Sequence, residues 1–267
     1  GSMAGSEVAY ECVFERAGII RCESINKQFG YARAFSEQPV PTGKRVAVIT
    51  NAGGPGIMAA DAIEREGLTF AGFTPETEKK LMENLPPAAN VKNPVDILGD
   101  ALSDRYEFSL NTVLDDPGVD IVLVLLTPQA VTECTKTAEG IVRINREKSE
   151  KTLIVSFMGA DKVAEAKKIL QEGSVPEYDS PESAVETIRV MTNYMHWRSR
   201  PKRVVKLFPV NRHKVEKIID RYMRRKQREI GEMDSKEILE AYGFVTPQGS
   251  IATTDRKSTR LNSSHYS

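Results

Sequence analysis

Short apolar runs alternate with amphipathic segments between residues 44 and 197. Arg45–Thr50, Val119–Leu126 and Thr152–Phe157 are rich in apolar and β-branched residues, as is typical of strands buried on both faces of a parallel sheet. The segments between them carry apolar residues at helical spacing, as at Ile57 and Ile63. Strands that alternate with helices over short loops predict an α/β fold, a doubly wound parallel sheet with helices on both faces.

Capping residues place the remaining elements of this region. Thr74 precedes a proline and acidic residues in a first helical turn, and Ser24 and Ser103 are expected N-caps of two further helices. A long helix is expected to open at Thr127 and to end near Glu147. The pattern also predicts helices at 7–17, 24–35, 57–65, 74–85, 103–114, 161–171 and 181–197, short strands at 17–21, 68–73 and 175–178, and an extended loop at 93–97.

The pattern divides the chain into five parts. Residues 1–42 are predicted to form the last helix–strand–helix of a preceding domain. Residues 43–197 are predicted to form the α/β domain itself. Residues 198–231 are basic, and an exposed linker with one helix fits them better than a nucleic-acid arm, because the whole chain is neutral. Residues 232–254 predict the opening of another domain. Residues 255–267 are polar and patternless, typical of a disordered, non-native tail.

Charge and cysteine usage narrow the function classes. Lysine plus arginine and aspartate plus glutamate number 37 each, so no net field favours nucleic acid or an anionic membrane. Cys12, Cys22 and Cys134 show neither CxxC nor metal-ligand spacing, and we expect reduced, buried thiols and no metal site. No apolar run approaches about 18 residues and no signal-peptide pattern is present, so a cytoplasmic protein is expected.

The turn after the first strand carries the candidate chemistry. Asn51-Ala-Gly-Gly-Pro-Gly56 separates that strand from a helix, and a helix start presents free backbone N–H groups and a positive dipole end. Because Gly53, Gly54 and Gly56 have no Cβ, an anion could approach their backbone closely. The spacing matches neither a P-loop nor a dinucleotide fingerprint. The turn is therefore either a phosphate cradle or only a tight βα turn.

Two further loops follow strands and should converge with this turn on one rim of the sheet. They are Thr127–Gln129 and Met158–Gly159. Ligands of open parallel sheets bind beyond the carboxyl ends of the strands, where these loops lie. In the extended loop, Asn93 and Asp96 are predicted to brace the sheet rim structurally.

A series of motifs occurs in order across residues 4–197. The motifs are Ala4–Glu7, Val46–Asp61, Leu85–Ala89, Asn93–Asp96, Gly99–Asp100, Asp116–Pro117, Leu126–Gln129 and Ser156–Gly159. Together they resemble the NDP-forming acyl-CoA synthetases, the group of ADP-forming acetate–CoA ligases related to succinyl-CoA synthetase. A set of motifs this long, in family order, is highly specific. A shorter stretch, Ser235–Phe244, resembles the start of the family's ATP-grasp domain.

The resemblance implies an enzyme that joins a small carboxylic acid to CoA while ATP is cleaved to ADP and phosphate, through an acyl phosphate and a phosphohistidine. It implies a flavodoxin-like domain of the succinyl-CoA synthetase type, with CoA-binding and ATP-grasp domains or subunits of the same ligase as partners. ATP/ADP with Mg and CoA would serve the whole enzyme, none bound tightly by this chain. The implied phosphate-binding residues are Asn51, Ala52, Gly53, Gly54, Gly56, Thr127 and Gln129.

The family's histidine lies in a Ser-His-Thr-Gly motif, which is expected just upstream of Gly1. Gly1-Ser-Met3 could equally be the remnant of a tag. His196, His213 and His265 lie in the last helix, the linker and the tail, and are predicted to be surface or packing residues. We therefore expect the catalytic histidine to be absent from this chain and the chain to be inactive alone.

Two other functions fit parts of the pattern. Some protein lysine acetyltransferases contain a similar synthetase-like module that senses ligands, but the ATP-grasp-like stretch at Ser235–Tyr242 favours the ligase. An upstream Ser-His-Thr-Gly motif, or its absence, would distinguish these two. A flavodoxin-like domain that binds a flavin is a third possibility, and it predicts a yellow protein.

Overall fold

The computed structural model describes residues 7–148, 150–201 and 210–247 of the 267-residue chain. The predictions for Gly1–Met3 and for the tail at 255–267 lie outside the described residues. The chain divides into two compact units, Gly1–Arg200 and Pro201–Ser267.

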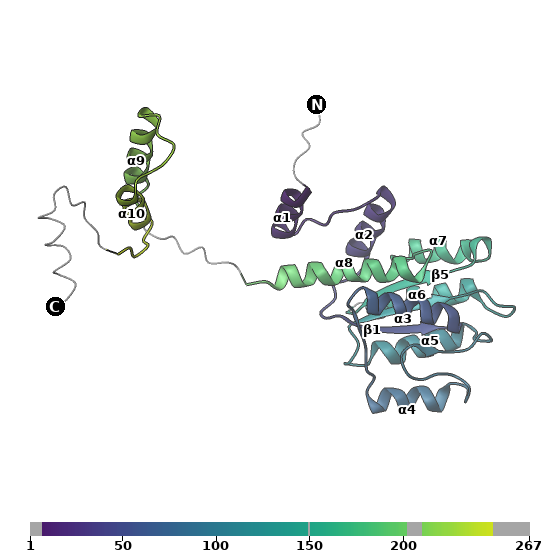
Figure 1. Ribbon diagram of the computed structural model, residues 1–267. Coiled ribbons are helices and arrows are strands. Elements are labelled where there is room, and N and C mark those ends of the chain that lie inside the picture. The colour runs from purple at the N-terminus through teal and green to yellow at the C-terminus, as the bar shows by residue number, and fades with distance from the viewer. Residues whose placement is uncertain (1–6, 149, 202–209, 248–267) are drawn as a thin grey trace, which may run out of the picture. The chain divides into compact units, whose positions relative to one another are not determined.

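A five-stranded, fully parallel sheet lies at the centre of the first unit (Figure 1). Its strands are β1 (Arg45–Thr50), β2 (Thr69–Phe70), β3 (Val95–Asp96), β4 (Ile121–Leu126) and β5 (Thr152–Phe157). The order is β2-β1-β4-β5, and β3 also pairs with β1. Because β4 occupies one edge of β1 along its length, β2 and β3 follow one another along the other edge.

Helices cover both faces of the sheet. In the first unit they are α1 (Glu7–Ala17), α2 (Ile25–Glu37), α3 (Gly53–Arg65), α4 (Pro75–Asn84), α5 (Ser103–Leu114), α6 (Cys134–Glu147), the 3-10 helix η1 (Ala160–Val163), α7 (Ala164–Glu172) and α8 (Pro181–Ser199). The second unit contains α9 (Arg212–Arg224) and α10 (Glu232–Ala241). Val46 and Val48 of β1 pack with α2, α3 and α8, whereas Ala47 and Ile49 pack with α4 to α7. This alternation confirms the predicted doubly wound α/β fold.

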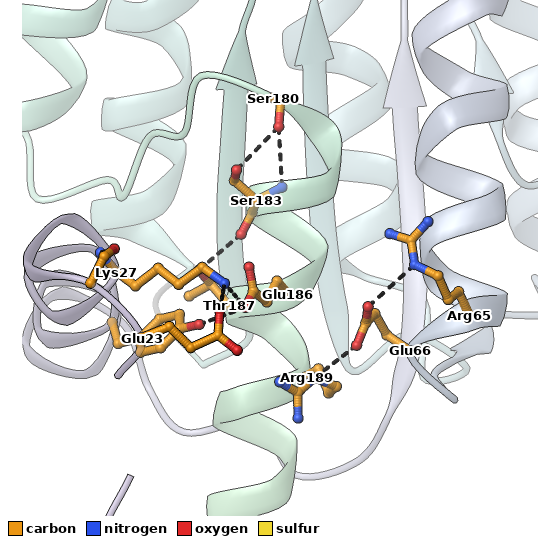
Figure 2. Close-up of polar contacts among 11 residues, drawn as sticks. Glu23, Lys27, Arg65, Glu66, Ser180, Ser183, Glu186, Thr187 and Arg189 are labelled. Carbon is orange, nitrogen blue, oxygen red and sulfur yellow. Dashed lines mark hydrogen bonds and ion pairs between the residues drawn. The ribbon is translucent and has the colours of Figure 1, made fainter. Parts of the chain in front are cut away.

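Helix α8 joins α2 and α3 on one face of the sheet. The Lys27 ammonium lies 2.7 Å from a Glu186 carboxylate oxygen that also accepts a hydrogen bond from the Tyr31 hydroxyl (2.9 Å), and Arg189 lies 2.8 Å from Glu66 at the end of α3 (Figure 2). The second helix of the predicted N-terminal remnant therefore packs on the α/β domain that follows it.

Asn93 fills a gap in the pairing of β1, between the end of β2 and the start of β3. Its Oδ1 accepts a hydrogen bond from the Val48 amide (2.9 Å). Its Nδ2 donates to the carbonyl oxygens of Val46 (2.7 Å) and Ala71 (3.1 Å). The side chain thus bonds the Val48 amide and adds a second donor to the Val46 carbonyl, which also accepts from the Ala71 amide (2.9 Å). Strand β3 lies within the segment predicted as an extended loop.

Several element boundaries differ from the predictions. Residues 17–21 form no strand, and the predicted strand at 175–178 is reduced to a single bridge between Val155 and Glu177. Ser103 is the first residue of helix α5 and not its N-cap, which is Leu102. The Ser103 hydroxyl donates to the Glu133 carboxylate (3.0 Å). Where capping was predicted at Ser24 and Thr74, both hydroxyls accept an amide of the first helical turn.

The cysteines are more accessible than predicted. Cys12 is exposed, Cys22 and Cys134 are half-buried, and all three are free, so the prediction of buried thiols is wrong, most clearly for Cys12. Partial burial raises the pKa of the Cys134 thiol. Among the described helices, none has the length and apolar character needed to cross a membrane.

Two buried carboxylates at the amino end of the sheet predict acid sensitivity. Asp120 accepts from Arg45 Nε (2.8 Å), Nη2 (2.7 Å) and its backbone amide (2.9 Å), and these hydrogen bonds lower the pKa of Asp120 despite burial. For Asp116, burial acts to raise the pKa, but hydrogen bonds from the Thr74 and Gly118 amides and threonine hydroxyls outweigh it and leave it lowered.

A lowered folded-state pKa means that this stabilisation is present above the unfolded pKa of about 3.9 and is lost as the pH falls through the folded value. We expect the free energy of unfolding, measured with urea, to fall below about pH 4. The variant Asp120→Asn, which has no carboxylate to protonate, should show a shallower acid loss. An unchanged pH slope in that variant would contradict this assignment.

Candidate functional site

The three predicted loops meet at the carboxyl rim of the sheet. The Asn51 side chain makes two hydrogen bonds with the Thr127 backbone. Its Nδ2 donates to the Thr127 carbonyl oxygen (2.8 Å), and its Oδ1 accepts from the Thr127 backbone amide (2.9 Å). Gly159 lies so close to Pro128 that an added Cβ would be 2.4 Å from the proline Cγ. The loops that follow β1, β4 and β5 are therefore in direct contact with one another.

Two backbone N–H groups remain open at the start of α3. The N-cap Ala52 has no capping side chain, and its own amide donates to Thr50 Oγ1 (3.1 Å). Gly56 N donates to the Ala52 carbonyl (3.3 Å), and Pro55 has no N–H. In the described part of the chain, the amides of Gly53 and Gly54 have no hydrogen-bond partner.

Both open amides belong to residues that are exposed. A Cβ added to Gly54 would meet no heavy atom within 4 Å, and one added to Gly53 would lie 3.7 Å from Asp96 Oδ2. The other carboxylate oxygen of Asp96 accepts the Leu98 amide (2.9 Å). At the positive end of the 13-residue α3, the space that a Gly54 side chain would enter is thus open, and a carboxylate lies near the corresponding space at Gly53.

The other members of the predicted phosphate-binding set have different surroundings. Asn51 is 2% exposed, and the nitrogen and the oxygen of its side chain each bond the Thr127 backbone, so this side chain is buried against the neighbouring loop. A Cβ at Gly56 would lie 3.1 Å from Thr50 Cγ2, so this glycine allows α3 to approach β1. Of the predicted glycines, Gly53 and Gly54 are those whose backbone amides have no hydrogen-bond partner among the described residues.

Thr127 and Gln129 do not open a helix, because α6 begins only at Cys134. The Thr127 hydroxyl oxygen is buried and has no hydrogen-bond partner among the described residues. The Gln129 amide donates to Thr132 Oγ1 (2.9 Å), and its exposed side chain lies over Gly99, with Cγ 3.5 Å from the position of an added Cβ. Both residues therefore belong to a loop of the rim rather than to a helix start.

Sequence reasoning missed three residues that shape this rim. Thr50 donates its hydroxyl to the Ala52 carbonyl (2.8 Å) and fixes the turn, and its position between strand and helix is the available signal. Tyr106, which is 1% exposed, donates to the Leu125 carbonyl (3.1 Å), and burial raises the pKa of its phenol. Arg105 pairs with Asp100 (2.6 Å), and that hydrogen bond lowers the pKa of the carboxylate.

Two cavities lie along α8, and neither includes a residue of the predicted set. One of about 450 Å³ is lined by Phe14, Trp197 and three arginines, each paired with a glutamate. The other, of about 250 Å³, lies beside the Lys27–Glu186 pair. Their charged groups are already paired within the chain.

The histidines provide no centre at the rim. His196 is exposed on α8, His213 is exposed on α9 in the second unit, and His265 lies outside the described residues. Within the described ranges, no group of three or more histidine, cysteine, aspartate and glutamate side chains could hold a metal ion.

The fold is that of an open parallel α/β domain, the class in which ligand sites lie beyond the carboxyl ends of the strands. Residues 46–204 match the Ligase-CoA domain, and the chain belongs to this family.

Curated relatives and solved structures agree with this family. The chain is 34% identical over 261 residues to 4-hydroxybutyrate–CoA ligase [ADP-forming] of Nitrosopumilus maritimus, which covers 97% of the chain and 37% of the relative. It is 37% identical to acetate–CoA ligase [ADP-forming] I of Archaeoglobus fulgidus (96% and 36%). A dinucleotide-forming acetyl-coenzyme A synthetase 1 of Ca. Korarchaeum cryptofilum, in complex with phosphate and ADP, matches with a TM-score of 0.69 and 34% identity over 74% of the chain and 43% of the structure. The chain thus spans little more than a third of the two relatives.

Proposed function

We propose that the chain is part of an NDP-forming acid–CoA ligase, which interconverts acyl-CoA, ADP and phosphate with a carboxylate, CoA and ATP through a phosphohistidine. In this reaction, the start of α3 would bind the phosphoryl group that the histidine carries between active sites. The observation that carries this proposal is the pair of open amides of Gly53 and Gly54 on the carboxyl rim. The relatives named above are ligases, and no observation favours the acetyltransferase alternative.

The geometry suits a phosphoryl group for an electrostatic reason. Backbone N–H donors held by a helix do not have to reorganise as negative charge moves onto or off the phosphorus oxygens, and the dipole end of α3 adds a partial positive charge. The Asp96 carboxylate borders the Gly53 side, so the anion is expected on the open Gly54 side. The buried Thr127 hydroxyl could donate a further hydrogen bond from the neighbouring loop.

The remaining tasks of the ligase fall to other parts of the protein. We propose that 1–42 ends a preceding domain, that 43–197 is the ligase domain, that 198–231 is a linker and that 232–254 opens an ATP-grasp domain, with 255–267 as a non-native tail. The boundary between the two compact units, after Arg200, supports this division. The CoA-binding and ATP-grasp partners would then bind CoA, ATP and Mg²⁺, and the phosphorylated histidine would lie outside this chain. We place the reaction in the cytoplasm.

An activity comparison tests this proposal. With ATP, CoA and either acetate or 4-hydroxybutyrate, the 267-residue chain alone should form no acyl-CoA and release no ADP above background. The same chain within a complete ligase, with its upstream and downstream parts, should do both and should carry an acid-labile phosphoryl group on histidine. Turnover by the chain alone would overturn the division of tasks, and an inactive complete ligase would overturn the function.

A further inference from the structure

Asn51 precedes the two residues with open amides in sequence, and its side chain bonds a neighbouring loop through both of its polar atoms. Its Nδ2 donates to the Thr127 carbonyl (2.8 Å) and its Oδ1 accepts from the Thr127 amide (2.9 Å). Because one partner is a donor and the other an acceptor, the orientation of the Asn51 amide is determined by these contacts. The pair lies just beyond Thr50 and Leu125, the last residues in register between β1 and β4.

We infer that Asn51 is a positioning residue, which fixes the turn before α3 against the end of β4 and so holds the Gly53 and Gly54 amides in place for the phosphoryl group. This inference rests on the proposed function. Asn51 reaches Gly53 through a single residue, Ala52, whose amide and carbonyl are both bonded to the Thr50 hydroxyl. With Ala52 fixed on one side and Asn51 on the other, the amides meet a ligand without reorganisation, which is what electrostatic stabilisation requires.

The chain contains a matched control for this inference. Asn93 also uses all of its side-chain polar groups to bond backbone, but its partners are Val46, Val48 and Ala71, in the middle of β1 and beside β2. The change Asn93→Asp therefore places a carboxylate against carbonyl oxygens, as Asn51→Asp does. It does not alter the contacts between Asn51 and Thr127 at the carboxyl rim. A role in stability is common to both residues, and a role in positioning belongs to Asn51.

The test compares phosphorylation of the complete ligase in the two variants. In Asn51→Asp the carboxylate faces the Thr127 carbonyl, so two acceptors repel one another and the turn is displaced. A misplacement of about 1 Å can slow a reaction about 100-fold, and we expect histidine phosphorylation by ATP to slow roughly 10- to 100-fold per folded molecule, with the KM for CoA unchanged. Asn93→Asp should lower the melting temperature but leave that rate unchanged per folded molecule.

Acid should rescue the Asn51→Asp variant. A protonated carboxyl can donate its O–H to the Thr127 carbonyl and accept from the Thr127 amide, as the wild-type side chain does, so the deficit relative to wild type should shrink from about pH 8 to about pH 6. The titratable group beside the Asn51 backbone is Tyr106 of α5, and Asp96 of β3 and Cys134 of α6 act in turn on the Tyr106 phenol. Wild type carries them too, so the ratio of variant to wild type removes their contribution.

The outcomes separate the inference from the proposed function. If the wild-type ligase carries no phosphohistidine, the proposed function fails. If it does, and Asn51→Asp is phosphorylated at the wild-type rate, or Asn93→Asp is slowed equally, Asn51 is not a positioning residue. Asn51→Ala removes the pair without adding repulsion and serves where Asn51→Asp does not fold at neutral pH. Its deficit should not change with pH, and an acid rescue of this variant too would contradict the inference.

Discussion

Replacing Asn93 with alanine should lower the free energy of unfolding of the chain by about 3 to 5 kcal/mol. The change leaves the Val48 amide and the Ala71 carbonyl oxygen without their Asn93 partner, and it removes one of the two donors to the Val46 carbonyl, which keeps the Ala71 amide. Val46 and Val48 are fully buried in β1, and each unsatisfied buried group costs about 1 to 3 kcal/mol. Urea denaturation of the 267-residue chain measures the difference directly.

A second asparagine controls for the substitution itself. Asn84, at the exposed end of α4, donates to the Lys80 carbonyl (2.9 Å). Because water can satisfy that carbonyl, Asn84→Ala should change the free energy of unfolding by no more than about 0.5 kcal/mol. If Asn93→Ala costs less than about 1 kcal/mol, water enters the gap in the β1 pairing and Asn93 is not what closes it.

Local sequence signals were sufficient for the main elements of the fold. The boundaries of β1 and β5 and those of α1 match the prediction residue for residue, because an apolar β-branched run or a continuous helical spacing is a property of neighbouring residues. The start of α6 was missed because the loop from Thr127 to Glu133 is held by contacts distant in sequence. Ser103, for example, is bonded to Glu133 on another helix end rather than capping its own helix.

The composition of the candidate site depended on contacts that spacing does not encode. The sequence identified the turn of Asn51 to Gly56, but not which of its N–H groups stay open. That outcome is decided by the Thr50 hydroxyl, which takes the Ala52 amide, and by Thr127, which takes both polar atoms of the Asn51 side chain. The Thr50 contact is local, but the pairing of Asn51 with Thr127 requires the final register of β1 and β4, so a motif alone assigns the loop but not all of its donors.

Replacing Gly54 with valine should slow histidine phosphorylation in the complete ligase about 100-fold, within the range found when a single preorganised donor is lost. A Cβ at this position would enter space with no heavy atom within 4 Å, so the helix start can accept a side chain there, and we expect that side chain to hinder the approach of an anion to the amides. A branched residue before Pro55 is disfavoured in the helical region, at a cost of about 1 kcal/mol in stability. The rate is therefore compared per folded molecule, from labelled ATP and circular dichroism.

Two further glycines make this experiment specific. Gly53→Val tests the same site at a residue that does not precede a proline. Its Cβ would meet only Asp96 Oδ2, at 3.7 Å, so a side chain fits there. Gly72→Val is the control, because its Cβ would also meet nothing within 4 Å but Gly72 lies beside Gly118, which precedes β4 at the amino end of the sheet. We expect phosphorylation to slow in both rim variants and to stay unchanged in Gly72→Val. Phosphorylation at the wild-type rate in both rim variants would show that the glycines serve only to make a tight turn between β1 and α3.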